Sequence, residues 1–197
     1  MHQLRLTACI LLQKLDSLET LSLPKGATNK FLAYAAKLKL LKILYVSRTR
    51  ISDKAVNKYL PMLTELEELS ISGQNITDAG LEFLADMPKL VYLNLRSGNF
   101  TDAGMDHVRK CSSLKYLDLL NLPITDIGVK KLSGHPGLES LLLAKTEVTD
   151  NSLQYLKSIP KLKELSIGKT GRQNQITDSG MKHIGKLRQL EYLQLPS

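Results

Sequence analysis

One motif recurs along this chain and limits what the chain can fold into. Its skeleton is L-x-x-L-x-[LI]-x-x-x-x-[IVF]-T-D-x-[GS]-[LMV]-x-x-[LV], and the copy from Leu90 to Ser113 reads LVYLNLRSGNFTDAGMDHVRKCSS. A unit this short cannot bury its apolar face alone. The repetition therefore predicts a solenoid in which each unit is completed by its neighbours. The units start at Leu18, Leu41, Leu66, Leu90, Leu114, Leu138, Leu162 and Leu190.

The hydrophobic period changes within each unit, and this change predicts the secondary structure. Counting from the first leucine, positions 3 to 7 alternate between polar and apolar, as from Tyr92 to Arg96. Alternation is typical of a short strand with one buried face. Positions 16, 19 and 22 then step by three, as in Leu81, Leu84 and Met87, which predicts a short helix. The sequence thus predicts an α/β solenoid.

A Thr-Asp pair stands between the expected strand and helix of most units, and a glycine often follows two residues later. Thr or Asp can cap the free N–H groups of a helix, and a carboxylate suits the positive end of the helix dipole. A ladder of metal-binding carboxylates is the alternative, but capping explains the pattern more simply. The pairs are Ser52-Asp53 (a variant), Thr77-Asp78, Thr101-Asp102, Thr125-Asp126, Thr149-Asp150 and Thr177-Asp178.

Charge, cysteine content and hydropathy narrow the class of protein. The net charge of +8 suits an acidic partner, but the basic residues are dispersed, as on an ordinary solvated surface. About four repeats separate Cys9 from Cys111, too far for a disulfide, so we expect free thiols and a cytoplasmic location. No apolar stretch is long enough to span a bilayer, and the opening residues follow the repeat phase better than they fit a signal peptide.

The skeleton L-x-x-L-x-L followed by I-T-D-x-G-L resembles a leucine-rich repeat. It is similar to the cysteine-containing subtype and its shorter bacterial relatives, because Cys111 to Leu114 preserves the C-x-x-L step. The resemblance implies a right-handed horseshoe with a parallel sheet on the concave face and short helices on the convex face. It also implies protein recognition. Many members of the subtype follow an F-box in ubiquitin-ligase assemblies, which would require a segment before Leu18.

We expect a single leucine-rich repeat domain over residues 1–197. It has about seven full repeats, starting at 18, 41, 66, 90, 114, 138 and 162, with partial units at the ends. The partial units suggest a segment of a longer array, or an array capped by something else. The polar insertion from Gly171 to Asn174 is expected to bulge from the surface.

The histidines offer no catalytic or metal-binding constellation. His2, His107, His135 and His183 fall in different units, and His135 is interpreted as a helix-end residue. No nucleophile–base set or cluster of metal ligands can be assembled from the sequence. We therefore expect a non-enzymatic protein without cofactors.

The alternation in each strand identifies side chains that leave the core on the concave face. In the middle units these side chains form a mixed aromatic, aliphatic and charged patch, to which Tyr45 adds a further aromatic ring. Tyr and Arg are favoured anchors of protein interfaces, although Tyr is also a good strand residue. The predicted partner-binding residues are Tyr45, Tyr92, Asn94, Arg96, Tyr116, Asp118, Leu120 and Leu142.

These observations predict a protein-interaction scaffold that binds a partner on its concave face. It could be the recognition part of a longer protein or a bacterial effector. The alternative is binding of a nucleic acid or an anionic surface through the positive charge, which would make the affinity steeply salt-dependent. Glu68, Asp118 and Glu164 are expected on the concave face and count against this alternative.

Overall fold

The computed structural model describes residues 15–167 and 176–195. Cys9 and the apolar steps before Leu15 lie outside these ranges, as does the insertion from Gly171 to Asn174. The predictions for those segments therefore stay predictions.

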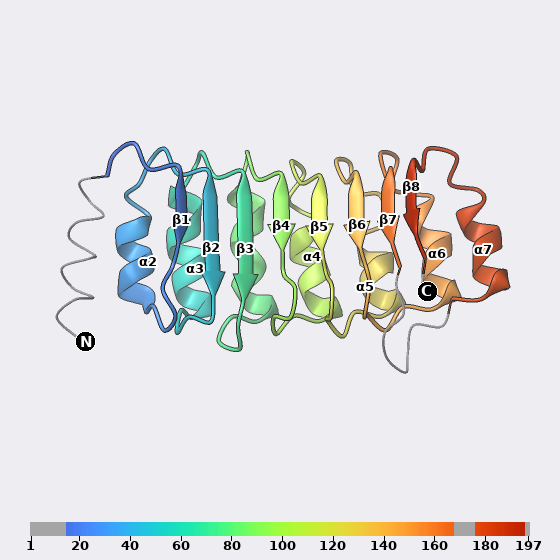
Figure 1. Cartoon of the computed structure of the whole chain (residues 1–197), viewed down its shortest axis with the longest axis horizontal. Helices are drawn as coiled ribbons and strands as arrows, with labels where there is room; N and C mark the ends of the chain where they lie inside the picture. Colours follow the sequence, from blue (N-terminus) through green and yellow to red (C-terminus); the bar gives the residue numbers. More distant parts are fainter. Residues whose placement is uncertain (1–14, 168–175, 196–197) are drawn as a thin grey trace.

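Eight strands form a single parallel sheet in the order of the sequence, from β1 to β8 (Figure 1). Each strand pairs in register with the next, so that residues at the same position of successive units lie side by side, as Leu69, Leu93 and Leu117 do. The strands are β1 (Thr20–Ser22), β2 (Ile43–Ser47), β3 (Glu68–Ser72), β4 (Tyr92–Asn94), β5 (Tyr116–Asp118), β6 (Ser140–Leu142), β7 (Glu164–Ser166) and β8 (Tyr192–Gln194).

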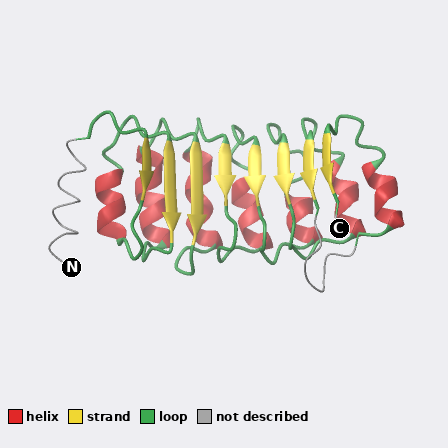
Figure 2. Cartoon of the chain, viewed as in Figure 1, coloured by secondary structure: helices red, strands yellow, loops and turns green. Residues whose placement is uncertain are grey.

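Short helices cover one face of the sheet and leave the other face open (Figure 2). The chain runs down each strand, returns behind the sheet through a helix and moves on to the next strand, which is the right-handed crossover that parallel strands require. The helices are α2 (Asn29–Ala35), α3 (Asp53–Tyr59), η1 (Leu60–Met62), η2 (Asp78–Asp86), η3 (Asp102–Gly104), α4 (Met105–Val108), α5 (Asp126–Lys131), α6 (Asp150–Leu156) and α7 (Asp178–Ile184). The η2 segment is a 3-10 helix, which suits the three-residue spacing of Leu81 and Leu84.

Most strands are shorter than the five residues predicted from the alternation. Only β2 and β3 run for five residues, whereas the other strands have three. In β4 and β5 a side chain competes for the backbone: Asn94 Oδ1 accepts a hydrogen bond from Arg96 N, and Asp118 Oδ1 accepts one from Leu120 N, both at 2.9 Å. These local bonds divert N–H groups from strand pairing.

The core lies between the sheet and the helices, as the repeat predicts. The inward leucines of successive strands, such as Leu69 and Leu93, have no exposed surface, and Leu90 and Leu114 are equally buried. These side chains form one continuous cluster along the solenoid. Burying a leucine contributes about 1.5–3 kcal/mol, so the repeated layers dominate the stability of the fold.

The Thr-Asp pairs connect neighbouring units, which the capping interpretation did not anticipate. Thr101, Thr125, Thr149 and Thr177 do cap their own helices, each accepting a hydrogen bond from the backbone N–H two residues later. The aspartate instead reaches the next unit. Asp102 Oδ1 accepts from Thr125 N at 2.9 Å, and its Oδ2 accepts from Thr125 Oγ1 at 2.6 Å.

The same pair of bonds recurs along the array, and we call the set the Asp–Thr ladder. Both oxygens of each ladder carboxylate are engaged with donors of the following unit. In the first rung Asn29 and Ser52 replace Asp and Thr and exchange two hydrogen bonds of 2.9 and 3.0 Å. The remaining rungs join Asp53 to Thr77, Asp78 to Thr101, Asp102 to Thr125, Asp126 to Thr149 and Asp150 to Thr177.

His135 is buried rather than being a simple helix-end residue. Its side chain has no exposed surface, and its Nδ1 accepts hydrogen bonds from Gly137 N at 3.2 Å and Leu138 N at 3.1 Å. Nε2 therefore carries the proton and donates to the carbonyl oxygen of Cys111 at 3.0 Å. The imidazole thus joins two units at the helix-to-strand turn, where Cys111 is itself buried.

Candidate binding surface

The open face of the sheet carries two rows of outward side chains, one at the first residue of each three-residue strand and one at the third. Register pairing brings Glu68, Tyr92 and Tyr116 side by side in the first row. It brings Asn94 beside Asp118, and Asp118 beside Leu142, in the second row. The predicted residues of β4, β5 and β6 are therefore brought together. We call Tyr45, Glu68, Tyr92, Tyr116 and Asp118 the central patch.

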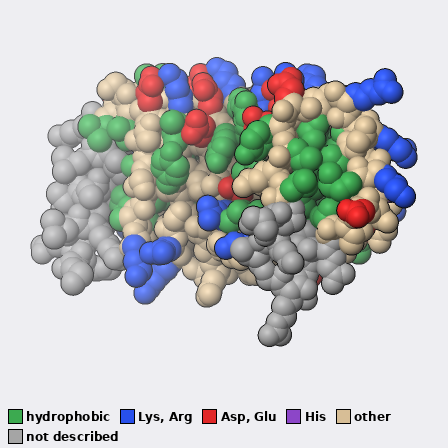
Figure 3. Space-filling view, turned by 45° about the vertical axis from the view of Figure 1, so that its right-hand side comes forward, with side chains coloured by type: hydrophobic (Ala, Val, Ile, Leu, Met, Phe, Trp, Pro, Cys, Tyr) green, Lys and Arg blue, Asp and Glu red, His purple; other side chains and the backbone are tan. Residues whose placement is uncertain are grey.

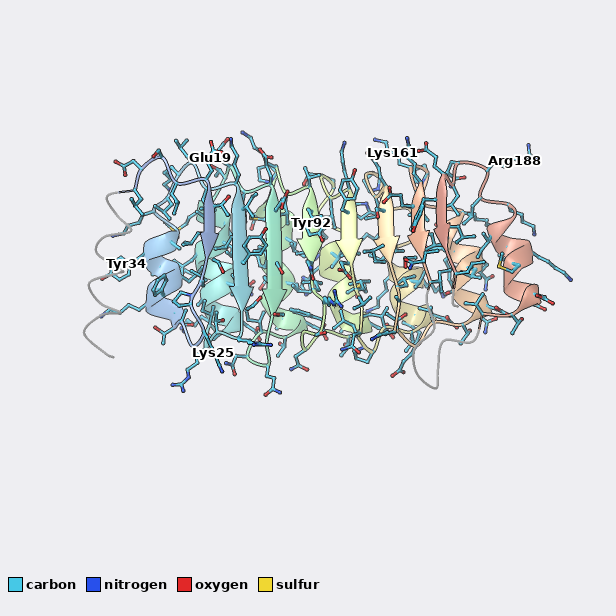
Figure 4. All side chains as sticks on the ribbon, viewed as in Figure 1. Glu19, Lys25, Tyr34, Tyr92, Lys161 and Arg188 are labelled. Carbon is cyan, nitrogen blue, oxygen red and sulfur yellow. The ribbon has the colours of Figure 1, made fainter. Side chains whose placement is uncertain are left out.

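The tyrosines are the most prominent feature of this patch. The ring centroids of Tyr92 and Tyr116 are 6.4 Å apart, with a tilt of 32° between the ring planes. Tyr116 is 38% exposed and Tyr45 is 41% exposed, while Tyr92 is half-buried between its neighbours. Tyr92 stands on the strand side of the molecule, away from the helices (Figure 4). Aromatic pairs in this range of separations attract each other and offer a stiff contact surface.

The other predicted residues contribute unequally. Asp118 is only 7% exposed. Like Asn94, it accepts a hydrogen bond on one side-chain oxygen from the backbone N–H two residues later. Leu120 and Leu142 are partly buried, so they expose less apolar surface than the alternation suggested. Arg96 is exposed beyond the end of β4. The patch is thus an aromatic surface over a buried carboxylate, with Arg96 at its border.

Comparison with known proteins agrees with this architecture. Residues 63–85 and 86–106 match the family model described as "Leucine Rich repeat". No curated protein sequence matches the chain. An internalin (inlF) from Listeria monocytogenes superposes with a TM-score of 0.67 at 24% identity, over 92% of this chain and 49% of that one. The chain has a leucine-rich repeat fold.

Two further solved structures share this leucine-rich repeat fold. An internalin C2 (inlC2) from Listeria monocytogenes gives a TM-score of 0.63 at 22% identity, over 93% of this chain and 83% of that one. A chain of the Rad7 and Elc1 complex from yeast gives 0.64 at 20% identity, over 84% of this chain and 44% of that one. This chain therefore spans about half the length of two of these three structures.

The outward rows of the leucine-rich repeat sheet differ in charge from the rest of the molecule. Lys and Arg outnumber Asp and Glu by 27 to 19 in the whole chain. Across the first and third outward positions of β1 to β8 there are three carboxylates and no Lys or Arg. The residues at these positions are Thr20, Ser22, Ile43, Tyr45, Glu68, Ser70, Tyr92, Asn94, Tyr116, Asp118, Ser140, Leu142, Glu164, Ser166, Tyr192 and Gln194.

The carboxylates act on Tyr92 directly. Burial is the main cause that raises the pKa of Tyr92, and the negative charge of Asp118 is the next. Glu68 raises this pKa as well, while a hydrogen bond with Asn94 lowers it. Two carboxylates therefore disfavour the ionised form of Tyr92, although the molecule as a whole is positively charged.

The basic residues lie mostly at the borders of the sheet. Figure 3 shows Lys and Arg along the upper edge, at the right-hand end and on the lower part of the visible face, with hydrophobic side chains over its middle. Just before several strands, residues of opposite charge pair between neighbouring units, as Lys115 does with Glu139 at 3.2 Å and Lys163 with Glu191 at 2.9 Å. These exposed pairs are each worth about 0–1 kcal/mol, but they neutralise part of the positive edge.

Glu68 is the residue that the sequence-based prediction of the site left out. It was assigned to the concave face but not to the binding patch, although the alignment of repeats already places it beside Tyr92. Its side chain is exposed, unlike that of Asp118. Ser140 and Ser166, which stand at outward positions of β6 and β7, are buried.

Across residues 15–167 and 176–195, no group of three or more His, Cys, Asp and Glu side chains is arranged to hold a metal ion. Among the helices assigned in those ranges, none is long and apolar enough to cross a bilayer.

Proposed function

We propose that this leucine-rich repeat chain is a non-enzymatic scaffold that binds a partner protein on the open, concave face of its sheet. The observation that carries the proposal is the exposed aromatic pair of Tyr92 and Tyr116, with Tyr45 nearby, on strands whose first and third outward positions hold no Lys or Arg. Tyrosine is enriched among the residues that dominate protein–protein affinity.

The strands beneath this surface support the same function. Tyr92 pairs with Tyr116 across β4 and β5, and the next pair along these strands is Leu93 with Leu117. Both leucines are buried in the continuous core. The strands therefore hold the rings in place before any partner arrives. A surface that is already ordered loses little conformational entropy on binding, which favours affinity.

The competing explanation is that the tyrosines merely stabilise the strands. Strand propensity would explain tyrosines that are covered by their neighbours. It does not require Tyr45 and Tyr116 to remain about two-fifths exposed above a fully buried layer of leucines. Exposed aromatic surface is more simply explained by a partner that covers it.

Three further features extend this proposal: the subtype of the repeat, the assembly in which the chain works and its location. We place the chain in the cysteine-containing subtype because Cys111 occupies its expected position and is buried, and because the Thr-Asp pairs recur. We also propose that it works within a longer protein or a larger assembly, as one solved chain of this fold occurs in a complex of Rad7 and Elc1. Cys111 is a free thiol, which suits a reducing, cytoplasmic location.

The test is to replace Tyr92 and Tyr116 together by Ala. We expect the affinity for a partner, isolated by pull-down and identified by mass spectrometry, to fall by about 2 kcal/mol or more in calorimetry. Thermal stability should change by only about 0.5 kcal/mol, because both side chains leave the strand on the side away from the core.

Two controls accompany this variant. Tyr192→Ala removes an exposed ring in the same outward row, on β8, and should leave the affinity unchanged. Leu93→Ala should cost about 2–5 kcal/mol of folding stability, since it leaves a cavity in the core. Unchanged affinity in the double tyrosine variant would move the site away from the central patch.

A further inference from the structure

The central patch combines negative charge with aromatic rings, and this combination restricts the chemistry of the partner. Tyr92 lies between Glu68 on β3 and Tyr116 on β5 in the first outward row. Asp118 lies on β5 two residues beyond Tyr116, and so sits diagonally across from Tyr92. The Tyr92 ring therefore has a carboxylate on the strand to each side.

We propose that the central patch binds a cationic side chain, Lys or Arg, presented by the partner protein. This inference rests on the proposed function and adds the chemical class of the group that is recognised. The cation sits over the faces of Tyr92 and Tyr116, with Glu68 as its exposed counter-ion and Asp118 as a second, more buried negative charge.

Physical chemistry favours a cation at this position over the other classes of side chain. An ammonium or guanidinium group is attracted by the negative faces of tyrosine rings. It is also attracted by two carboxylates in a region of reduced dielectric. An acidic side chain would be repelled by Glu68 and Asp118. A purely apolar group would leave the charge of Glu68 partly desolvated and unpaired.

The protein's own cations do not satisfy the patch. Glu68 and Asp118 form no ion pair with any of the described side chains, whereas carboxylates at the sheet border, such as Glu139 and Glu191, do. The other titratable group that acts on Tyr92 is Tyr45, so no cation of the protein is among them. Lys163 interacts with Tyr116, but its ammonium group pairs with Glu191 at 2.9 Å, at the border of the sheet.

The experiment selects ligands without assuming a partner. The intact chain is immobilised and a random-peptide phage library is selected against it. The selected peptides are then sequenced, and their dissociation constants are measured for four proteins. These proteins are the wild type, the double variant with Tyr92→Ala and Tyr116→Ala, Glu68→Gln, and Glu164→Gln as a matched control. Glu164 is an exposed glutamate of the same outward row, two strands beyond Tyr116.

We expect the selected peptides to be enriched in Lys and Arg relative to the unselected library. Glu68→Gln should weaken their binding about 3- to 5-fold, the range set by exposed ion pairs and cation–π contacts. Glu164→Gln should leave the dissociation constant unchanged. Circular dichroism and thermal melting of each variant separate these effects from loss of the fold.

Two results would overturn the inference in distinguishable ways. In the first, the peptides need the two tyrosines, but they are not enriched in basic residues or their binding does not respond to Glu68→Gln. This result would keep the protein-binding function and reject the proposal that the patch binds a cation. If the selection yields no peptide that depends on the two tyrosines, the proposed binding surface fails together with the inference.

Discussion

At the scale of single residues, the ladder carboxylates explain why a glycine recurs at the same position of most units. A Cβ atom built on Gly104 would lie 2.6 Å from Oδ1 of Asp78 and 2.9 Å from Cδ1 of Leu81. Asp78 cannot move aside without breaking its bonds to Thr101. The glycine therefore makes room for the carboxylate of the neighbouring unit, and this allows the two units to stack closely.

This contact predicts the effect of Gly104→Ala. The substitution should lower the free energy of unfolding by about 1–3 kcal/mol, as overpacking of a tight site does. The matched control is Gly185→Ala. Gly185 has an ordinary helical φ of −59°, and a Cβ there would approach only Met181 O, at 3.5 Å. Urea unfolding should show the control to be neutral or stabilised by about 0.4–1 kcal/mol. Equal effects of the two substitutions would contradict this account.

His135 makes stability depend on pH. Burial is the main cause that lowers its pKa, and the charge of Arg109 lowers it further, against an opposing effect of the Cys111 carbonyl. The unfolded chain then takes up a proton near pH 6.5, while the folded chain takes it up only at lower pH. The stabilisation is therefore complete above about pH 6.5 and is lost as the pH falls below it.

We expect urea unfolding midpoints to decrease between about pH 7.5 and about pH 5, before most carboxylates titrate. The assignment can be checked by NMR, since the His135 ring should remain neutral at a pH where the histidine of an unfolded chain is already protonated. A His135 ring that titrates in the same way in the folded and the unfolded chain would contradict the prediction.

At the scale of elements, the Asp–Thr ladder predicts a coupling between neighbouring helices. Asp102→Ala leaves the N–H and hydroxyl of Thr125 without their partner at the start of α5. The loss should be about 1–3 kcal/mol in denaturant unfolding. Asp102→Asn should retain much of the stability, because the natural rung between Asn29 and Ser52 already uses an amide.

The control for this series is Asp106→Ala. Asp106 lies four residues further along the same unit and pairs only with Lys131, on the surface, at 2.6 Å. Removing an exposed pair should cost no more than about 0.5 kcal/mol. If Asp102→Ala were as mild as Asp106→Ala, the ladder would not contribute to stability.

The sequence predicted the elements of the fold because their signals lie within one unit. The alternation around Leu93 and the three-residue steps of Leu81 and Leu84 identify strand, helix and core without knowledge of neighbours. The ladder could not be predicted from one unit, because Asp102 bonds to Thr125 in the next unit. Capping within a single unit also accounts for a Thr-Asp pair at this position. The burial of His135 was missed because a polar residue at a helix end is normally solvated.

The candidate site, too, could be predicted only in part from the sequence. Parallel register could be inferred, so the meeting of Tyr92 with Tyr116 was predictable. The depth of each side chain was not, because the exposure of Asp118 depends on its neighbours and on local backbone bonds such as the one from Leu120 N. Alternation reports the side of a strand from which a residue leaves, but not how far its neighbours cover it.

At the scale of the whole molecule, the separation of charge predicts weak, salt-sensitive binding of anionic ligands. The positive edge is partly neutralised by pairs such as Lys42 with Glu19, and the sheet face carries carboxylates. We therefore expect a short DNA duplex to bind only at low salt and to be released by about 150 mM salt, because its affinity would come from the phosphates alone.

Fluorescence anisotropy across a salt series measures this directly. Glu68→Gln should not change the residual low-salt binding, since the DNA would contact the edge rather than the central patch. Tight binding that persists at about 150 mM salt, or that strengthens when Glu68 is neutralised, would favour the nucleic-acid alternative.

The Asp–Thr ladder also bears on how such a chain can grow by gene duplication. Each rung between Asp and Thr takes its acceptor from one unit and its donors from the next, so a duplicated whole unit of this kind brings one new acceptor and one new donor pair. The number of complete rungs then rises by one, and no polar group loses its partner. The rung between Asp150 and Thr177 forms although 27 residues separate them, so extra residues between the two halves of a rung are tolerated as well. A change in length that removed only one half of a rung would leave a carboxylate or a helix start without its partner, and selection would act against it.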